Sequence, residues 1–437
     1  MKKSIINNYT LKFILGAIST FLIGSILRLN LLVPTFLLSL VIYLKCRQSQ
    51  LKYSLLNLIF LFVIAFSVSY FVITHGKARF YIPFSLIPML ATILFNDLEL
   101  SLVISLATSF VLASLWANRL DLGLIFFVSG MVASILVLNA RRRSVIIRAG
   151  FISGIIQALL ISFTHFLFSG RVNLMSSFFF LLNGVVSSIV VLGVLPLFEY
   201  LFKTVTNISL LELADFNHPL LQRMVLEAPG TYHHSLVVGN LSDAACISVG
   251  ANGLLARIGA YYHDIGKINK PDYFSENQNI YESKHNGLSP HMSKLIIMNH
   301  VREGVELAKR YKLNPRLIDF ILQHHGNSLV YYFYRRALEN LEEDYEIKEE
   351  GFRYPGPRPK TKETAIVLLA DSVEAATRAL ENPSPQKIKE LVHKIINNRF
   401  IDGQLDECDL TLKDLEKIAA VFIRILTGIY HSRISYP

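Results

Sequence analysis

The sequence predicts an all-α fold: a polytopic bundle of about eight transmembrane helices, followed by an all-helical soluble domain. Three observations predict this fold class. Hydrophobic residues make up 52% of the 437 residues, which is too apolar for one soluble fold. Long apolar runs fill residues 11–201, and after Lys203 the pattern changes to amphipathic segments without strand alternation. We expect a transmembrane domain over residues 1–205 and a soluble domain over residues 206–437.

Eight apolar runs in the first half have about the length that a helix needs to cross a bilayer. Roughly 20 residues span about 30 Å of hydrocarbon, and a helix satisfies its own backbone polar groups there. The second run is short and contains Pro34, so seven crossings, or a re-entrant segment at this place, stay open. The runs are residues 11–27, 31–45, 54–74, 79–95, 99–116, 121–139, 147–168 and 175–200.

Short basic segments predict the orientation of these helices, because Lys and Arg near helix ends are enriched on the cytoplasmic side. With eight crossings, all basic segments and everything after Phe202 lie on one side. With seven, the N-terminus and the second half lie on opposite sides. The parity favours eight crossings and a cytoplasmic second half. The basic segments are Lys2 with Lys3, residues 45–52 and residues 141–148.

Charge and cysteine content limit the function only loosely. The formal net charge of +10 is compatible with nucleic acid, an anionic membrane surface or an anionic substrate. Cys46, Cys246 and Cys408 lie far apart and form no CxxC pair. A disulfide scaffold and a thiolate zinc site are therefore not expected.

Helical patterns continue through the second half. Ser209 to Glu212 and Thr411 to Asp414 each fit a helix-starting capping box. Residues 338–362 contain a proline-rich stretch and are expected to form an exposed loop. The predicted helices are residues 234–250, 254–265, 290–311, 315–324, 363–381, 385–398 and 411–430.

Histidines cluster in the soluble half, where nine of the thirteen lie between His218 and His325. An adjacent His-Asp pair stands at the end of an apolar helix and is followed by Gly266 and Lys267. Such a pair shares a metal site only if other elements supply further ligands. The candidate ligands are His234, His263, Asp264, His300, His324, His325 and Asp371.

These residue types indicate a divalent metal centre. Imidazoles and carboxylates suit ions such as Mn, Fe or Zn. A carboxylate has two oxygens and can bridge two ions. Two ions about 3.5–4 Å apart can hold a hydroxide between them, direct it at phosphorus and neutralise the charge that develops on the phosphoryl oxygens. The predicted chemistry is therefore phosphodiester hydrolysis.

The order of these residues resembles the HD superfamily in its two-metal form, and the surrounding motifs resemble the seven-transmembrane HD-hydrolase family. Further similarity lies in residues 81–90 and in the tail at 402–405, 410–415 and 430–437. The motifs are EAPGTYHHS at 227–235, HDIGK at 263–267, FSENQ at 274–278, NHVREGVELA at 299–308, QHHG at 323–326 and LADSVEAA at 369–376.

The resemblance implies a cytoplasmic HD domain in a bacterial membrane protein, and a division of the ligands between two ions, most readily Mn or Fe. One ion would be held by His234, His263, Asp264 and Asp371. The other would be held by Asp264, His300, His324 and His325, with Asp264 as the catalytic bridge.

Two basic residues are candidate substrate contacts. Lys267 resembles the family's lysine near the metal centre, and its flexible point charge suits a catalytic role and a phosphate contact. Arg302 follows a ligand by two residues and is the second phosphate candidate. Lys267 can also be interpreted as a solvated cation at a helix end.

Members of this family are cyclic di-AMP phosphodiesterases of the PgpH type, so the implied reaction is hydrolysis of cyclic di-AMP to pApA. Alternatives are hydrolysis of cyclic di-GMP or an alarmone, and a non-catalytic membrane sensor or scaffold. The Gly-Tyr-Pro element of the cyclic di-GMP class is missing after Gly326, and single-metal alarmone hydrolases do not need His300, His324 and His325. The lipid bilayer is an expected partner, polymeric nucleic acid is not, and a homo-oligomer stays open.

Two departures from the family pattern are visible. Members carry a large extracellular domain after the first transmembrane helix, where this chain has about three residues, Leu29 to Leu31. Sensory input through such a domain is not expected here. Asn327 stands where the family often has Thr.

Overall fold

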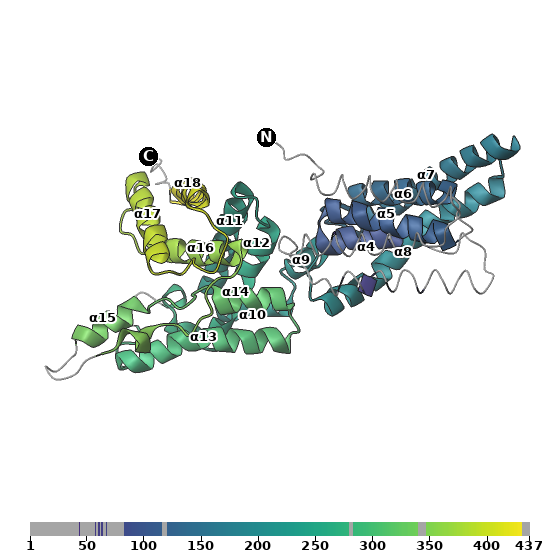
Figure 1. Ribbon diagram of the computed structural model, residues 1–437. Coiled ribbons are helices and arrows are strands. Elements are labelled where there is room, and N and C mark those ends of the chain that lie inside the picture. Colours follow the sequence, from purple (N-terminus) through teal and green to yellow (C-terminus); the bar gives the residue numbers. More distant parts are fainter. Residues whose placement is uncertain are drawn as a thin grey trace, which may run out of the picture. The chain divides into compact units, whose positions relative to one another are not determined.

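The computed structural model contains two compact units, which divide between Ile208 and Ser209 (Figure 1). It describes residues 83–115, 120–278, 283–339 and 347–430, and the single residues Tyr43, Asn57, Phe60, Leu61, Val63 and Ser67. Over these residues the secondary structure is helical, apart from one isolated bridge between Leu329 and Arg353. The prediction of an all-α chain is confirmed for this part of the sequence.

Five apolar helices make up the described part of the first unit. Two of them, α7 and α8, are long and apolar enough to cross a membrane, whereas the other three are shorter apolar helices. The first three predicted crossings, residues 11–27, 31–45 and 54–74, lie almost entirely outside the described residues, so the number of about eight stays a prediction. The helices are α4 (Leu86–Phe95), α5 (Leu98–Leu115), α6 (Leu120–Val137), α7 (Arg143–Ser169) and α8 (Leu174–Phe202).

Small residues bring α7 and α8 into close contact. A Cβ atom on Gly184 would lie 2.4 Å from the carbonyl oxygen of Gly150, and one on Gly154 would lie 2.3 Å from that of Leu181. Gly150 and Gly154 are four residues apart, the small-xxx-small spacing of membrane helix pairs. The sequence of α7 therefore sets the closeness of this helix pair.

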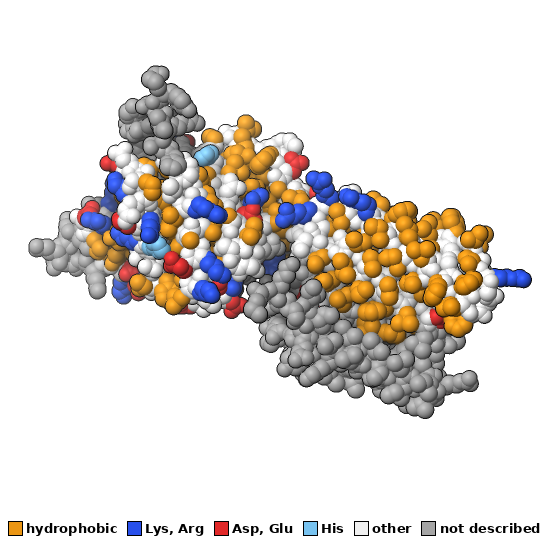
Figure 2. Space-filling model, turned by 90° about the horizontal axis from the view of Figure 1, so that it is seen from above, with side chains coloured by type: hydrophobic (Ala, Val, Ile, Leu, Met, Phe, Trp, Pro, Cys, Tyr) orange, Lys and Arg blue, Asp and Glu red, His pale blue; other side chains and the backbone are white. Residues whose placement is uncertain are grey.

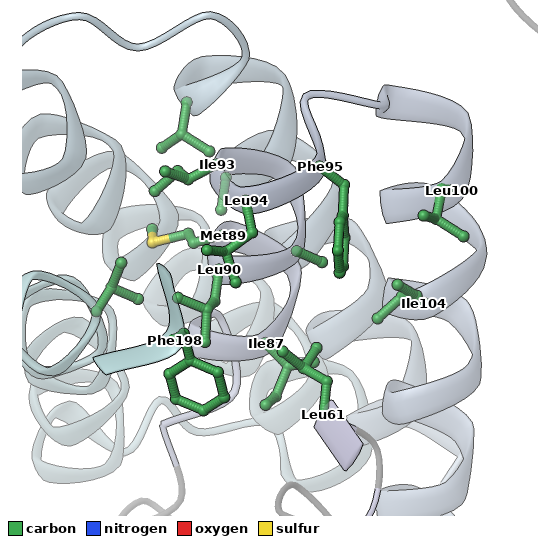
Figure 3. Close-up of a cluster of buried hydrophobic side chains, with 14 of the residues drawn as sticks. Leu61, Ile87, Met89, Leu90, Ile93, Leu94, Phe95, Leu100, Ile104 and Phe198 are labelled. Atoms are coloured by element: carbon green, nitrogen blue, oxygen red, sulfur yellow. The ribbon is translucent and has the colours of Figure 1, made fainter. Parts of the chain in front are cut away.

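The interior and the surface of this unit are both apolar. Figure 3 shows Met89 and Leu90 of α4 packed near Phe198 of α8, with Leu100 and Ile104 of α5 alongside. Hydrophobic side chains also cover the outward face of the helices (Figure 2). Extended apolar surface of this kind marks a membrane or protein contact.

The second unit is a helical domain with short 3-10 turns. The predicted start at Ser209 is wrong, because α9 begins at Asn207, whereas the capping box at Thr411 is confirmed by reciprocal hydrogen bonds with Asp414. Two helices that the sequence analysis did not predict are α10 and α15. The helices are α9 (Asn207–Leu213), α10 (Pro219–Glu227), α11 (Pro229–Ser248), α12 (Gly253–Tyr262), α13 (Pro290–Arg310), α14 (Pro315–Gln323), α15 (Tyr331–Glu339), α16 (Lys362–Arg378), α17 (Pro385–Ile401) and α18 (Leu412–Ile429).

Helix α16 is the centre of the second unit. Thr361 caps its N-terminus by accepting a hydrogen bond from the backbone N–H of Thr364. Every residue from Glu363 to Asp371 is buried, as expected for a helix covered on all sides. Because α11, α12, α14, α17 and α18 pack around α16, Asp371 is carried into the interior of the domain.

The predicted exposed loop at 338–362 is wrong in part. A 3-10 turn, η5 (Glu349–Phe352), lies within it, and residues 340–346 lie outside the described residues. Phe352 is fully buried and Tyr354 is 8% exposed. Both side chains pack against other parts of the domain, which local sequence composition does not reveal.

Candidate metal centre

The seven predicted ligands come from five helices and the turns that follow them. His234 lies on α11, the His-Asp pair follows α12, and His300 lies on α13. His324 and His325 follow α14, and Asp371 lies on α16. Their donor atoms form two groups, each within 4.8 Å, and Asp264 belongs to both groups.

Gly266 is the reason that the turn after the His-Asp pair can lie against α13. A Cβ atom at this position would stand 1.9 Å from the carbonyl oxygen of His300 and 2.5 Å from the backbone nitrogen of Gly304. Backbone atoms in a helix cannot move away, so only glycine fits this approach. The contact sets His300 beside Asp264.

Asp264 stands at the centre of the cluster. Its Oδ1 is 3.3 Å from His300 Nε2 and 3.4 Å from His324 Nε2, while its Oδ2 is 3.2 Å from His263 Nε2 and 3.8 Å from His234 Nε2. Each oxygen thus faces a different histidine pair. One carboxylate can therefore serve both donor groups.

Asp371 of α16 completes the arrangement. Its Oδ1 lies 3.0 Å from His234 Nε2 and 3.8 Å from His263 Nε2, and its Oδ2 lies 3.5 Å from His325 Nδ1. It is thus the second carboxylate in contact with histidines of both donor groups.

The donor atoms fit divalent metal ions. His263 Nε2 and both Asp264 oxygens are buried and make no well-aligned hydrogen bond to a described residue, although Lys267 forms an ion pair with Asp264 Oδ2. Buried polar atoms are nearly always satisfied, so such a concentration needs a further partner. The Nε2 atoms of His300 and His324 also lie 3.1 Å apart and face each other. A cation that accepts imidazole and carboxylate donors satisfies all of these atoms.

Hydrogen bonds from the Nδ1 atoms leave the Nε2 atoms of His263, His300 and His324 facing the cluster. His263 Nδ1 donates to Ala260 O at 2.6 Å, His324 Nδ1 donates to Ile321 O at 2.9 Å, and His300 Nδ1 donates to a carbonyl three residues earlier in the same way. A protonated Nδ1 leaves the Nε2 lone pair free. These hydrogen bonds therefore prepare the imidazoles as metal ligands.

Electrostatics favour the charge states that a metal site requires. Burial by itself would raise the pKa of Asp264, but His263 and Lys267 hold this pKa well below its usual range. Burial lowers the pKa of His324, and burial together with His324 lowers the pKa of His325 well below its usual range. Burial by itself would lower the pKa values of His234 and His263, but the neighbouring carboxylates raise both. The cluster thus offers an ionised carboxylate and, at His324 and His325, neutral imidazoles.

Lys267 belongs to the cluster. Its Nζ lies 2.7 Å from Asp264 Oδ2 and 2.7 Å from Glu276 Oε1, and the side chain is 11% exposed. The ammonium also lies 5.0 Å from the ring centre of Phe274. A buried ammonium between two carboxylates differs from the solvated helix-end cation considered for this residue.

Arg302 is not brought to the cluster. Its side chain is 81% exposed and forms an ion pair with Glu306 one turn further along α13, with 3.2 Å between Nε and Oε1. A two-residue offset turns a helical side chain to nearly the opposite face from His300. The structure gives Arg302 no support as a phosphate contact, and that assignment stays a prediction.

Three residues at the site were missed from the sequence. Glu374 accepts a hydrogen bond from His234 Nδ1, and its spacing of three from Asp371 on α16 was an available signal. Tyr354 packs against His325 with ring centres 4.3 Å apart and ring planes tilted by 31°. Gln404 lies beneath Gly326, whose Cβ would stand 2.2 Å from Gln404 Oε1. Neither of the last two could be located without the fold.

Asn327, which departs from the family pattern, has a defined structural role. Its backbone N–H donates to Gln404 Oε1 at 3.1 Å, and its Oδ1 accepts from Gln404 Nε2 at 2.8 Å. Arg358 Nε donates to the same oxygen at 3.2 Å. Asn327 thus ties the turn that follows His325 to the segment after α17.

Comparisons with known proteins match both halves of the chain. A family model described as "7TM receptor with intracellular HD hydrolase" matches residues 8–206, and a model of the HD domain matches residues 231–376. The HD-domain match includes all seven clustered residues.

Two bacterial relatives carry the name cyclic-di-AMP phosphodiesterase PgpH. The protein from Bacillus subtilis is 44% identical over 72% of this chain and 45% of its own length. The protein from Listeria monocytogenes is 39% identical over 90% of this chain and 55% of its own length. The chain therefore spans about half the length of these curated relatives.

A solved structure also matches the second half. It is the HD domain of Listeria monocytogenes PgpH in complex with cyclic-di-AMP, with 46% identity, a TM-score of 0.47, and coverage of 50% of this chain and 100% of that one.

Proposed function

We infer that this chain, which belongs to the family of 7TM receptors with an intracellular HD hydrolase, is a membrane-bound phosphodiesterase that hydrolyses cyclic di-AMP to pApA. One observation carries the proposal: seven imidazole and carboxylate side chains gather in two donor groups that share Asp264. This donor set suits metal-assisted hydrolysis of a phosphodiester.

We propose two divalent ions, Mn or Fe, as the cofactors. His234, His263, Asp264 and Asp371 would hold one ion, and Asp264, His300, His324 and His325 would hold the other. When bound, such ions supply activation of water and neutralisation of the charge developing on the phosphoryl oxygens. Asp264 positions both donor groups through its two oxygens, and the Lys267 ammonium adds positive charge beside it.

The proposed substrate is supported by the two bacterial relatives named as cyclic-di-AMP phosphodiesterases. An alarmone hydrolase with one ion would not need His300, His324 and His325 as metal ligands. A non-catalytic sensor would not require the complete donor set. Cyclic di-GMP remains the second candidate, because it presents the same two phosphodiesters with different bases.

The location that we propose is a bacterial cytoplasmic membrane, with the HD domain in the cytoplasm. The apolar surfaces of α7 and α8 and the basic segment at 141–148 support this topology. About eight crossings in residues 1–205 and a soluble domain in residues 206–437 complete the proposal. Membrane lipid is then an obligatory partner.

The test uses the full-length chain in detergent, loaded with Mn or Fe and supplied with cyclic di-AMP, cyclic di-GMP or an alarmone. Chromatography should detect pApA from cyclic di-AMP, and Asp264→Asn should abolish its formation. A folded, metal-loaded sample without turnover of any of the three would exclude the enzyme proposal. Preferential turnover of cyclic di-GMP would show that cyclic di-GMP, and not cyclic di-AMP, is the substrate.

A further inference from the structure

Access to the metal centre is confined to one side of the cluster. The side chains of His234, His263, Asp264, His300 and His324 are at most 2% exposed. The side chain of His325 is 20% exposed and that of Asp371 is 10% exposed. A substrate phosphate therefore has to approach past His325 and Asp371.

Arg399 of α17 stands on this open side. Its Nε donates a hydrogen bond of 3.2 Å to the hydroxyl of Ser372, the residue that follows Asp371. The carboxylates of Asp371 and Asp402 and the ring of Tyr354 are close enough to influence the pKa of Arg399. Tyr354 in turn packs against His325. Through Ser372, Arg399 is thus held next to Asp371 on α16.

The guanidinium of Arg399 makes no other hydrogen bond or ion pair with the described residues. Two nearby arginines are different: Arg353 pairs with Asp402 at 2.8 Å, and Arg358 pairs with Asp406 at 3.0 Å. Burial lowers the pKa of the Arg399 guanidinium, which nevertheless stays charged. Asp371 and Asp402 act on this cation electrostatically, but only the neutral Ser372 hydroxyl accepts a hydrogen bond from it, so its other guanidinium nitrogens can donate to an anion.

We propose that Arg399 binds a phosphodiester of the substrate, at a position beside the metal centre, through the guanidinium nitrogens that Ser372 leaves free. A planar guanidinium suits two parallel hydrogen bonds to phosphate oxygens. The inference rests on the proposed function, because a cyclic dinucleotide carries two phosphodiesters and the metal centre takes only one. Arg399 holds the other and so favours cyclic dinucleotides over simple diesters.

The experiment compares two substrates on the full-length, metal-loaded chain. Cyclic di-AMP has two phosphodiesters, whereas bis(p-nitrophenyl) phosphate has one. Arg399→Gln should raise the KM for cyclic di-AMP by about tenfold to a hundredfold, the range for a lost hydrogen bond to a charged group. The kcat/KM for bis(p-nitrophenyl) phosphate should stay within about twofold, and the bound metal, measured by mass spectrometry, should not change.

Two further variants separate binding from structure. Arg399→Lys keeps the charge but loses the second parallel hydrogen bond, so its KM for cyclic di-AMP should fall between those of the wild type and Arg399→Gln. Arg424→Gln, an exposed arginine on α18, removes one charge elsewhere and should leave both substrates unaffected. If Arg399→Gln does not fold, the KM of Arg399→Lys for cyclic di-AMP tests the proposal in its place.

The outcomes are distinguishable. An equal loss on both substrates, or loss of metal, would make Arg399 a structural link between α17 and α16 and overturn the proposal. A wild-type KM for cyclic di-AMP in Arg399→Gln would overturn it as well, while leaving the phosphodiesterase intact. A wild-type chain that hydrolyses the simple diester but not cyclic di-AMP would remove the proposed function and this inference together.

Discussion

His234 differs from the other clustered histidines in the group that holds its outer nitrogen. His263, His300 and His324 use backbone carbonyls, whereas His234 uses the carboxylate of Glu374, which is 2% exposed. A carboxylate partner orients an imidazole ligand and raises its basicity. Glu374 is therefore a positioning residue that acts through His234.

Removal of Glu374 should weaken metal binding without removing a ligand. We expect Glu374→Ala to lower metal affinity by about 10- to 100-fold, and Glu374→Gln, whose amide oxygen can still accept a hydrogen bond, to lower it less. Metal content after dialysis against graded chelator concentrations measures the change. Glu416→Ala, at an exposed position on α18, is the matched control. Retention of metal by the alanine variant as in the wild type would refute the positioning role.

We propose Lys267 as a phosphate contact beside the cluster. Its ammonium forms ion pairs with Asp264 and Glu276 within the cluster. We expect Lys267→Met, which keeps the apolar stem, to raise KM by about tenfold through loss of a charge-assisted hydrogen bond. The bound metal should stay, because no ligand is removed. Steady-state kinetics with parallel metal analysis tests this, and normal kinetics would leave Lys267 with a structural role alone.

At the scale of helices, the sequence predicts those helix starts that local residue patterns determine. Helix α13 begins at the predicted residue, Pro290, and α17 begins at the predicted Pro385, because a proline in the first turn and a capping side chain mark the start of each. The capping box at Thr411 is recognised for the same reason. The seven clustered residues are recognised through the sequence motifs that surround them.

Features that depend on tertiary contacts were missed. Tyr354 lies in a proline-rich segment, and only its packing on His325 buries it. Glu374 resembles any polar residue of an amphipathic helix until α16 is found to be covered on all sides. Ser209 fits a capping box by composition, but α9 already starts at Asn207. The local sequence does not determine the burial of Tyr354 and Glu374 or the start of α9, because these depend on contacts with neighbouring helices.

The turn after α12 allows a test of helix-to-helix positioning. Gly266→Ala would push a methyl group against the His300 carbonyl, which a Cβ would approach to 1.9 Å. We expect a loss of at least about 1–3 kcal/mol in the free energy of unfolding, as in overpacked cores, and weaker metal binding because His300 is displaced from Asp264. Thermal unfolding and metal content report the two effects.

The control for this test is Gly287→Ala, because a Cβ at Gly287 meets no atom within 4 Å. It should change neither quantity by more than the error of measurement. A Gly266→Ala variant that behaves like the control would show that the turn can shift away from α13 without disturbing the cluster.

At the scale of the whole chain, the proposed metal ligands connect five helices of the second unit and none of the first. Ions bound there act as cross-links, and an ion at about 100 times its Kd stabilises the folded state by about 2.7 kcal/mol. Without them, the carboxylates and imidazoles of the cluster face one another in a buried space. Chelation should therefore loosen the second unit selectively.

Hydrogen exchange followed by mass spectrometry on the full-length chain tests this selectivity. After removal of metal, amides in α11, α13 and α14 should exchange faster, because the proposed ligands lie on these helices or directly after them. Amides in α7 and α8 should keep their protection, since the close glycine contacts between these helices involve no ligand. Readdition of Mn should restore the slow exchange. Faster exchange throughout both units would mean that the ions stabilise the molecule as one cooperative body, whereas unchanged exchange in α11, α13 and α14 would mean that the cluster is held by its protein contacts alone.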